Sequence, residues 1–255
     1  MDSRLNTKKY LFKFRLNEEV FKVPKNFNNP FDINPPTIAQ EASILLQEYI
    51  QETTTDWSYN FHTQRGKMFG VLVIQQQNCE YGFLGAMSGK LPRASKGLKY
   101  VPSIFDDATD DYFINRGMTA ITELSREIRD SEDSKQVERL KALRKQKSLT
   151  VQRQLFESYK VLNKHGQLKN VLDIFHDRSH GGPPSATGEC AAPKLLHFAF
   201  KHRLKPVAIA EFWWGNSSKN KRRIQGHYYQ ACKDKCRPIL EYMLDDTRLF
   251  DQVQR

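Results

Sequence analysis

Three cysteines in the last part of the sequence are the residues whose type and spacing point most directly to chemistry. Two form a Cys-x-x-x-Cys pair and the third precedes them by a long segment: Cys190, Cys232 and Cys236. Thiolates are soft ligands that select zinc, and a close pair with a distant third is a common zinc-ligand pattern. We therefore expect these cysteines to bind zinc. A buried role in the core is the alternative, because cysteine is among the most buried residue types.

The elements that must position these thiols follow from the apolar pattern around them. Apolar residues at helical spacing follow Cys190 and again follow Cys232. Between these segments, residues 206–214 are short, apolar and β-favouring, and they end before Gly215. The pattern predicts helix, strand, helix, with a thiol at the start of each helix. A helix N-terminus favours negative charge and therefore favours the metal-binding thiolate.

Other uses of the cysteines and the fourth zinc ligand are left open by the sequence. A disulfide is less favoured, since there is no secretory signal and the chain is not a small cysteine-dense scaffold. A fourth ligand could be water, as in a catalytic site, or a histidine, as in a closed structural site. The candidate histidines are His180, His197 and His227. The remaining cysteine, Cys79, is predicted to lie in a turn away from the metal.

The cysteine-bearing segments resemble the zinc nucleobase deaminases, in which a His or Cys followed by Ala-Glu opens one helix and a Pro-Cys-x-x-Cys pair opens the next. Cys190-Ala191 stands at the first-ligand position, and Cys232 with Cys236 stands at the pair. The resemblance implies a zinc site in an α/β fold. The sequence departs from the family pattern by one extra residue within the pair.

A second departure concerns the proton-transferring glutamate of that family. The residue two positions after Cys190 is Ala192, whereas deaminase chemistry needs a carboxylate that carries a proton to the leaving amine. Glu189 and Glu211 lie nearby in the sequence and are the candidates to replace it. An active zinc-dependent, deaminase-like hydrolase is therefore one functional hypothesis, beside an RNA-binding module and a purely structural interaction protein whose basic face serves only solubility.

Composition and charge indicate a folded protein with a polyanionic partner. Hydrophobic residues make up 39% of the 255 residues and aromatic residues 11%, which suits a globular core and excludes a disordered chain. The formal net charge of +11 favours RNA as a partner, although excess charge also serves solubility. No apolar run approaches a membrane span and the N-terminus lacks the apolar core of a signal peptide, so we expect no membrane partner and a cytoplasmic location.

Periodicity divides the chain into four parts. Residues 1–36 are expected to form an N-terminal arm or short β segment, and residues 37–109 a helix and β hairpin that begin an α/β core. Residues 110–165 are expected to form a helical hairpin, and residues 166–255 the zinc-binding second part of the core. Without the hairpin, the element order resembles the deaminase core. The expected fold class is therefore α/β, a deaminase-like α/β sandwich with an inserted long helical hairpin.

The second helix of the predicted hairpin, over 133–164, carries nine lysines and arginines. They form either a solvated face or a track for a phosphate backbone, since such contacts increase with the number of cations. A second basic cluster precedes the Cys-x-x-x-Cys pair and is the favoured RNA contact. Its residues, with the aromatic pair before it, are Lys219, Lys221, Arg222, Arg223, Trp213 and Trp214. The tryptophans suit stacking on an unpaired base, or they belong to the core of an apolar strand.

Six long strings between residues 37 and 244 carry a second resemblance. They are GKMFGVLVI, GFLGAMSGKL, FESYKVLNKHGQLKNVLDIF, PPSATGECAAPKLLHFAF, KPVAIAEFWWG and HYYQACKDKCRPILEYML. In this order they resemble the N-terminal region of large RluA-type pseudouridine synthases, where that region precedes the catalytic domain. The catalytic aspartate of those enzymes lies in a His-Arg-Leu-Asp-like motif. Here His202-Arg203-Leu204 is followed by Lys205, so the motif is absent from this sequence.

The resemblance implies the expected function. The chain would be a zinc-binding, RNA-binding accessory module of an RluA-type pseudouridine synthase system, without the synthase catalytic domain. Its implied partners are a tRNA or rRNA and a separately encoded synthase. The deaminase-like hydrolase is the alternative.

Overall fold

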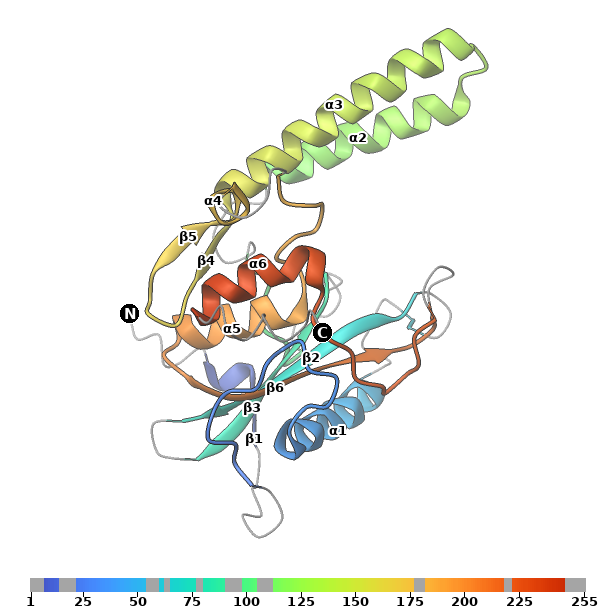
Figure 1. The fold of residues 1–255 in the computed structure, drawn as a ribbon. Helices are drawn as coiled ribbons and strands as arrows, with labels where there is room; N and C mark the ends of the chain where they lie inside the picture. Colours follow the sequence, from blue (N-terminus) through green and yellow to red (C-terminus); the bar gives the residue numbers. More distant parts are fainter. Residues whose placement is uncertain are drawn as a thin grey trace, which may run out of the picture.

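The computed structural model describes residues 7–13, 22–53, 60–61, 65–76, 80–89, 98–104, 112–176, 182–217 and 222–245, with the side chains of residues 112 and 113 excepted. Within these ranges the chain is a mixed α/β protein. Its main sheet is antiparallel and carries helices on both faces (Figure 1). Every helix in the described ranges is too short or too polar to serve as a membrane span.

The main sheet has four strands in the order β1-β3-β2-β6. They are β1 (Leu11–Lys13), β2 (Lys67–Gln75), β3 (Tyr81–Met87) and β6 (Lys205–Trp214), and each neighbouring pair is antiparallel. The predicted β hairpin and the predicted strand before Gly215 are therefore confirmed. β1 adds part of the N-terminal segment to the edge of the sheet, so the predicted arm is partly a strand.

Helices cover both faces of this sheet. α1 (Thr37–Glu52) packs on one face against β2 and β6, and α5 (Ala191–Lys201) packs on the other face against β2, β3 and β6. α6 (Lys233–Leu244) packs against α5. Alternate side chains of β2 point to the two faces, so that Val71 joins the α1 core and Leu72 the α5 core. Both faces are buried, which explains why the strands are apolar almost throughout.

Two long helices project away from this body (Figure 1). α2 (Tyr112–Asp130) and α3 (Ser134–Ser158) pack against each other, and we call them the α2–α3 hairpin. They approach closely at Gly117, where an added Cβ would lie 2.3 Å from the side chain of Val151. Asp133 caps α3 by accepting the backbone N–H of Lys135 at 2.9 Å.

A small second sheet connects this hairpin to the body. β4 (Lys160–Leu162) pairs with β5 (Leu168–Asn170), and α4 (Val171–His176) follows. The prediction of one helix over 133–164 is therefore wrong beyond Ser158. From Tyr159 onward buried and exposed residues alternate, which is the period of a strand and not of a helix.

The turn between β4 and β5 holds the C-terminal end of α6. The backbone N–H of Lys164 donates to the carbonyl of Met243 at 2.9 Å, and His165 Nε2 lies 2.9 Å from the carboxylate of Asp245. The hydroxyl of Tyr242 donates to the carbonyl of Gln167 at 2.8 Å. We call these contacts the α6 clasp.

Candidate functional site

The N-termini of α5 and α6 bring the three cysteines together. Cys190 immediately precedes α5, Cys232 immediately precedes α6, and Cys236 lies in the first turn of α6. All three are free thiols, and the thiol of Cys236 lies close enough to the side chains of both Cys190 and Cys232 to interact with them. The structure thus places the predicted ligands next to one another at helix starts. Metal binding itself stays a prediction.

The pKa values of Cys232 and Cys236 are shifted in opposite directions by their surroundings. A hydrogen bond from Cys236 lowers the pKa of Cys232 to about 5, helped by the backbone N–H groups of Lys235 and Asp234 and opposed by partial burial. The pKa of Cys236 is raised well above its ordinary value, because its thiol bonds with two other thiols and is buried. The Cys232 side chain does not cap α6. The contact with Cys236 is therefore the main cause of the low pKa, and the N–H groups at the start of α6 add to it.

Two observations bear on whether this cluster can bind zinc, and they disagree. Within the described ranges, no group of three or more His, Cys, Asp or Glu side chains is arranged so that it could hold a metal ion. The contacts of the Cys236 thiol with two other thiols favour a metal, because soft thiolate ligands select zinc. The types of the donor atoms therefore suit zinc, and zinc binding itself stays a prediction.

Glu211 brings a carboxyl group to the same place from β6. Its side chain is buried, and Oε1 accepts the backbone N–H of Ala192, in the first turn of α5, at 3.0 Å. Burial raises the pKa of Glu211 to about 7, against the hydrogen bond from Ala192; Cys232 raises it further and Arg223 lowers it. A carboxyl group that titrates near neutral pH can both take up and release a proton.

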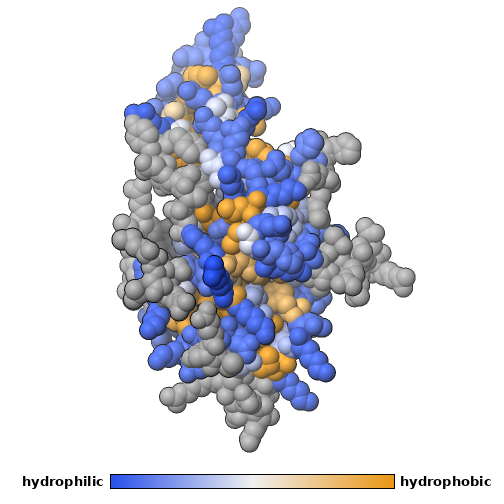
Figure 2. Space-filling view, turned by 90° about the vertical axis from the view of Figure 1, so that its left-hand side faces the viewer, coloured by the Kyte–Doolittle hydropathy of each residue, from blue (hydrophilic) through white to orange (hydrophobic). Residues whose placement is uncertain are grey.

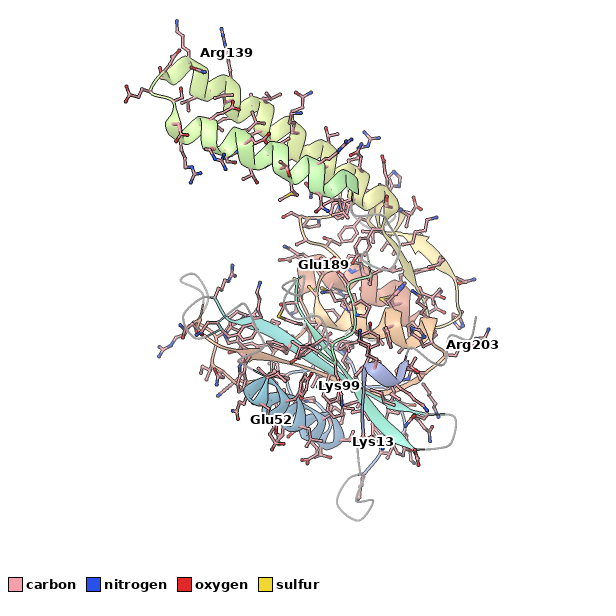
Figure 3. All side chains as sticks on the ribbon, turned by 180° about the vertical axis from the view of Figure 1, so that it is seen from behind. Lys13, Glu52, Lys99, Arg139, Glu189 and Arg203 are labelled. Atoms are coloured by element: carbon pink, nitrogen blue, oxygen red, sulfur yellow. The ribbon has the colours of Figure 1, made fainter. Side chains whose placement is uncertain are left out.

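Glu189, the other predicted proton carrier, is labelled in Figure 3 and forms an ion pair. Its Oε2 accepts a hydrogen bond from Ser103 at 2.6 Å and lies 3.3 Å from the Nζ of Lys194, a lysine that is 3% exposed. Lys194 also donates to two backbone carbonyls at the end of β3. Glu189 therefore neutralises a buried ammonium group that ties α5 to the sheet. This leaves Glu211 as the better placed proton carrier.

Tyr159 is a site residue that sequence reasoning missed. It is buried, its hydroxyl lies 3.5 Å from Glu189, and it interacts electrostatically with Cys190 and Cys236. Burial raises the pKa of Tyr159 well above its ordinary value, so that the hydroxyl stays protonated. Gly188 has a φ of +85°, and an added Cβ there would lie 2.6 Å from the tyrosine ring. No motif marks Tyr159, and only the alternation of apolar and polar residues from Tyr159 to Val161 could have indicated its burial.

The candidate histidines do not join the cysteines in the described part of the chain. His197 is buried on α5, where its Nδ1 accepts the backbone N–H of Leu162 at 3.2 Å. His227 is exposed in the loop before α6 and contacts Trp213 and Ile224 through its backbone. His180 and Cys79 lie outside the described residues. The structure therefore gives no support to His227 as the fourth ligand.

The predicted RNA-binding residues divide into two kinds. Trp213 and Trp214 are only 5% and 4% exposed, which contradicts the predicted stacking on an unpaired base: both rings belong to the core. The guanidinium of Arg223 lies 5.0 Å from the ring centroids of both Trp213 and Tyr229, and Arg222 is exposed. Lys219 and Lys221 lie outside the described residues. RNA contact by the basic residues stays a prediction.

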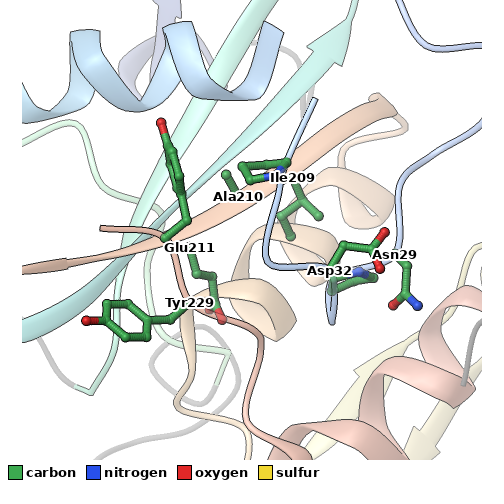
Figure 4. A pocket seen from close by; sticks show the side chains of 9 residues that line it. Asn29, Asp32, Ile209, Ala210, Glu211 and Tyr229 are labelled. Atoms are coloured by element: carbon green, nitrogen blue, oxygen red, sulfur yellow. The ribbon is translucent and has the colours of Figure 1, made fainter. Parts of the chain in front are cut away.

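A small recess lies beside Glu211, against residues 29–35 of the N-terminal segment (Figure 4). Asp32, Ile209 and Tyr229 are among its lining residues, and its volume is about 10 Å³, room for roughly one water. Asn28 holds the covering segment in place through two hydrogen bonds, of 3.0 and 2.8 Å, with the backbone of Ile209. The N-terminal segment therefore closes this side of the site.

Comparison with known proteins yielded no family model, no curated protein and no solved structure that matches the chain. Any assignment of function must therefore start from the residues themselves. Among the described residues, the strongest chemical feature is the group formed by three thiols and one buried carboxyl at the starts of α5 and α6.

Proposed function

We propose that the chain is a zinc-binding module with a deaminase-like core that serves RNA modification. The observation that carries the proposal is the contact of the Cys236 thiol with both Cys190 and Cys232, at the starts of two neighbouring helices. Three thiols near helix N-termini form a donor set that selects zinc. The three cysteines would be the protein ligands, and the fourth position would be open to water or another ligand.

The order of elements supports the deaminase-like part of the proposal. A helix, a β hairpin, a cysteine-led helix, a strand and a second cysteine-led helix follow one another. The α2–α3 hairpin and the β4–β5 sheet would be insertions between the β hairpin and the first of these cysteine-led helices. A zinc ion held between α5 and α6 would join two helices that pack against each other.

The role in RNA modification rests on the sequence resemblance and on charge. Six strings of the chain resemble the accessory region of RluA-type pseudouridine synthases, and the formal net charge is +11. The module would hold a tRNA or rRNA for a separately encoded synthase. Zinc would then be structural, since it would fix the start of α6 and with it the basic loop that precedes that helix.

Metal analysis of the purified protein tests the zinc part of the proposal. We expect about one zinc per chain in the wild type and its loss in Cys232→Ser and Cys236→Ser. Cys79→Ser is the matched control and should keep the metal, because Cys79 is not among the proposed ligands. A wild-type protein without zinc after refolding in the presence of zinc would overturn the proposal.

Glu211 favours a second candidate function, a zinc-dependent hydrolase of the deaminase type. Its carboxyl group accepts the N–H of Ala192, the position at which the deaminase pattern carries its glutamate, and its pKa is about 7. A strand side chain would thus replace the missing helix side chain. Zinc, when bound, would supply an activated water, and Glu211 would hold and move the proton.

A panel of nucleosides, nucleotides and RNA oligonucleotides that carry cytosine or adenine tests this second function. We expect Glu211→Gln to keep zinc and abolish deamination, whereas Glu189→Gln should retain activity per folded, zinc-loaded molecule. A zinc-loaded wild type that deaminates none of these compounds would exclude the hydrolase and leave the zinc module intact.

A further inference from the structure

The end of the main sheet that adjoins the thiol site also gathers positive charge from segments far apart in the sequence. β2 begins where β6 ends, since Lys67 pairs with Trp214 and the N–H of Gly66 donates to the carbonyl of Asn216 at 2.9 Å. The start of β2 therefore lies beside the basic loop that follows β6. We call the basic residues described on these two segments the sheet-end rim: Arg65, Lys67, Arg222 and Arg223.

Two sets of contacts connect this rim to the thiol site. On one side, Lys67 lies close enough to Lys194 for the charges to interact, and Lys194 pairs with Glu189, the residue before Cys190. On the other side, Arg223 interacts electrostatically with Glu211. Burial lowers the pKa of Lys67, and the charges of Arg65 and Lys194 lower it further. An anion at this place would interact favourably with both Arg65 and Lys67.

Arg223 adds a fixed orientation to this positive potential. Its guanidinium lies over the rings of Trp213 and Tyr229, 5.0 Å from each centroid. A guanidinium that lies over aromatic rings can still donate from the N–H groups at its own edges, and its planar fork matches the geometry of a phosphate. Because the side chain is already ordered, binding an anion costs little further entropy.

We infer that the sheet-end rim binds the phosphate backbone of single-stranded RNA and leads it past the thiol site. The inference rests on the proposed RNA-binding function and deepens it by assigning the surface. It adds Arg65 and Lys67, from the start of β2, to the residues of the basic loop before α6. The chemistry that recognises the partner is a row of phosphates met by cations from two strand ends.

The α2–α3 hairpin is the rival basic surface on the same chain. Successive residues of an α-helix turn by about 100°, so Arg139 and Lys147 lie on one side of α3 and Lys141 and Lys145 on nearly the opposite side. Figure 2 shows apolar side chains scattered among the hydrophilic ones on the hairpin. Figure 3 shows Arg139 at the hairpin tip and Glu189 near its base. The hairpin cations therefore form no single track to the site.

RNA binding by the zinc-loaded full chain, measured with a fluorescent uridine oligonucleotide at several salt concentrations, tests the inference. Arg65→Gln with Lys67→Gln should weaken binding about tenfold and lower the slope of log affinity against log salt by about 1.4, since each phosphate contact on a single strand contributes about 0.7. The matched control, Lys141→Gln with Lys145→Gln, removes the same charge from the hairpin and should leave affinity and slope unchanged.

A second rim variant is included because substitution of the half-buried Lys67 risks a folding defect. Arg65→Gln with Arg222→Gln changes two exposed residues and should weaken binding in the same way. Loss of binding in the hairpin variant with both rim variants unchanged would overturn the inference but leave RNA binding standing. A wild type that binds no RNA would overturn both the inference and the proposed RNA binding. Zinc retained in all variants would show that zinc binding does not depend on the rim.

Discussion

The thiol site and the α2–α3 hairpin use polar side chains in opposite ways. At the site, buried Lys194 pairs with Glu189, and buried Glu211 accepts a backbone N–H from α5. On the hairpin, residues 141–150 are all exposed, and the ion pair between Arg153 and Glu157 is open to water. Desolvated groups need partners and acquire altered chemistry, whereas solvated charges contribute little to stability. The number of charged residues is therefore a poor guide to where chemistry occurs, and burial together with a partner is a better one.

The largest contrast should appear in cysteine reactivity. Cys232 has a pKa of about 5, whereas a cysteine placed on the exposed hairpin by Ser148→Cys should have the ordinary value of about 8.5. Alkylation of the zinc-free protein, followed peptide by peptide with mass spectrometry from pH 4 to 9, should show Cys232 reacting half-maximally several pH units lower. Equal midpoints would show that the start of α6 does not stabilise a thiolate.

The second largest contrast should appear in the unfolding free energy lost by two leucine-to-alanine substitutions. Leu240 on α6 is completely buried and Leu143 on α3 is 42% exposed. Leu240→Ala should cost about 2–5 kcal/mol of unfolding free energy, because it leaves a cavity, and Leu143→Ala about 0.5 kcal/mol or less. Urea denaturation of the zinc-free protein measures both. A comparable loss in the two variants would mean that the hairpin packs against something in solution.

Stability of the zinc-free protein should depend on the charge of Glu211. Its folded pKa of about 7 lies above the ordinary value of 4.5, so the fold favours the neutral carboxyl, and this stabilisation is complete below about pH 4.5 and is lost as pH rises through 7. Glu211→Gln should therefore be more stable than the wild type above pH 7, by on the order of 3 kcal/mol. Glu138→Gln, on the exposed hairpin, should show no such pH dependence.

The smallest effect should come from the cap of α3. Asp133→Ala removes the side-chain acceptor for the N–H of Lys135 and should destabilise the first turn of α3 by about 1 kcal/mol. Hydrogen exchange should quicken at the start of α3 while the amides of α5 and the zinc content stay unchanged. A change at α5 would reveal energetic coupling between the hairpin and the thiol site.

Local patterns were enough to predict the elements that carry the cysteines. Apolar spacing after Cys190 and Cys232 located both helix starts, and the apolar run before Gly215 located β6. The same method extended α3 past Ser158, because spacing over a few residues fits a strand as well as a helix. Of the two predictions for the tryptophan pair, a place in the core was correct and stacking on a base was wrong. The sequence could not decide between them, because burial depends on which helix covers the strand.

Contacts between distant residues could not be predicted in this way. The bond from Ala192 to Glu211, the ion pair of Lys194 and the place of Tyr159 all depend on how α5 lies on the sheet. The sheet-end rim depends on the register that sets Lys67 opposite Trp214. Such pairings have no signature in the spacing of nearby residues.

The α6 clasp connects the α2–α3 hairpin to the thiol site. α6 is a short rod whose far end is held by the turn that follows α3 and β4, and whose near end carries Cys232 and Cys236. The projecting hairpin and the sulfur cluster are therefore joined by a continuous series of contacts through the β4–β5 turn and α6, and this series lies outside the main sheet.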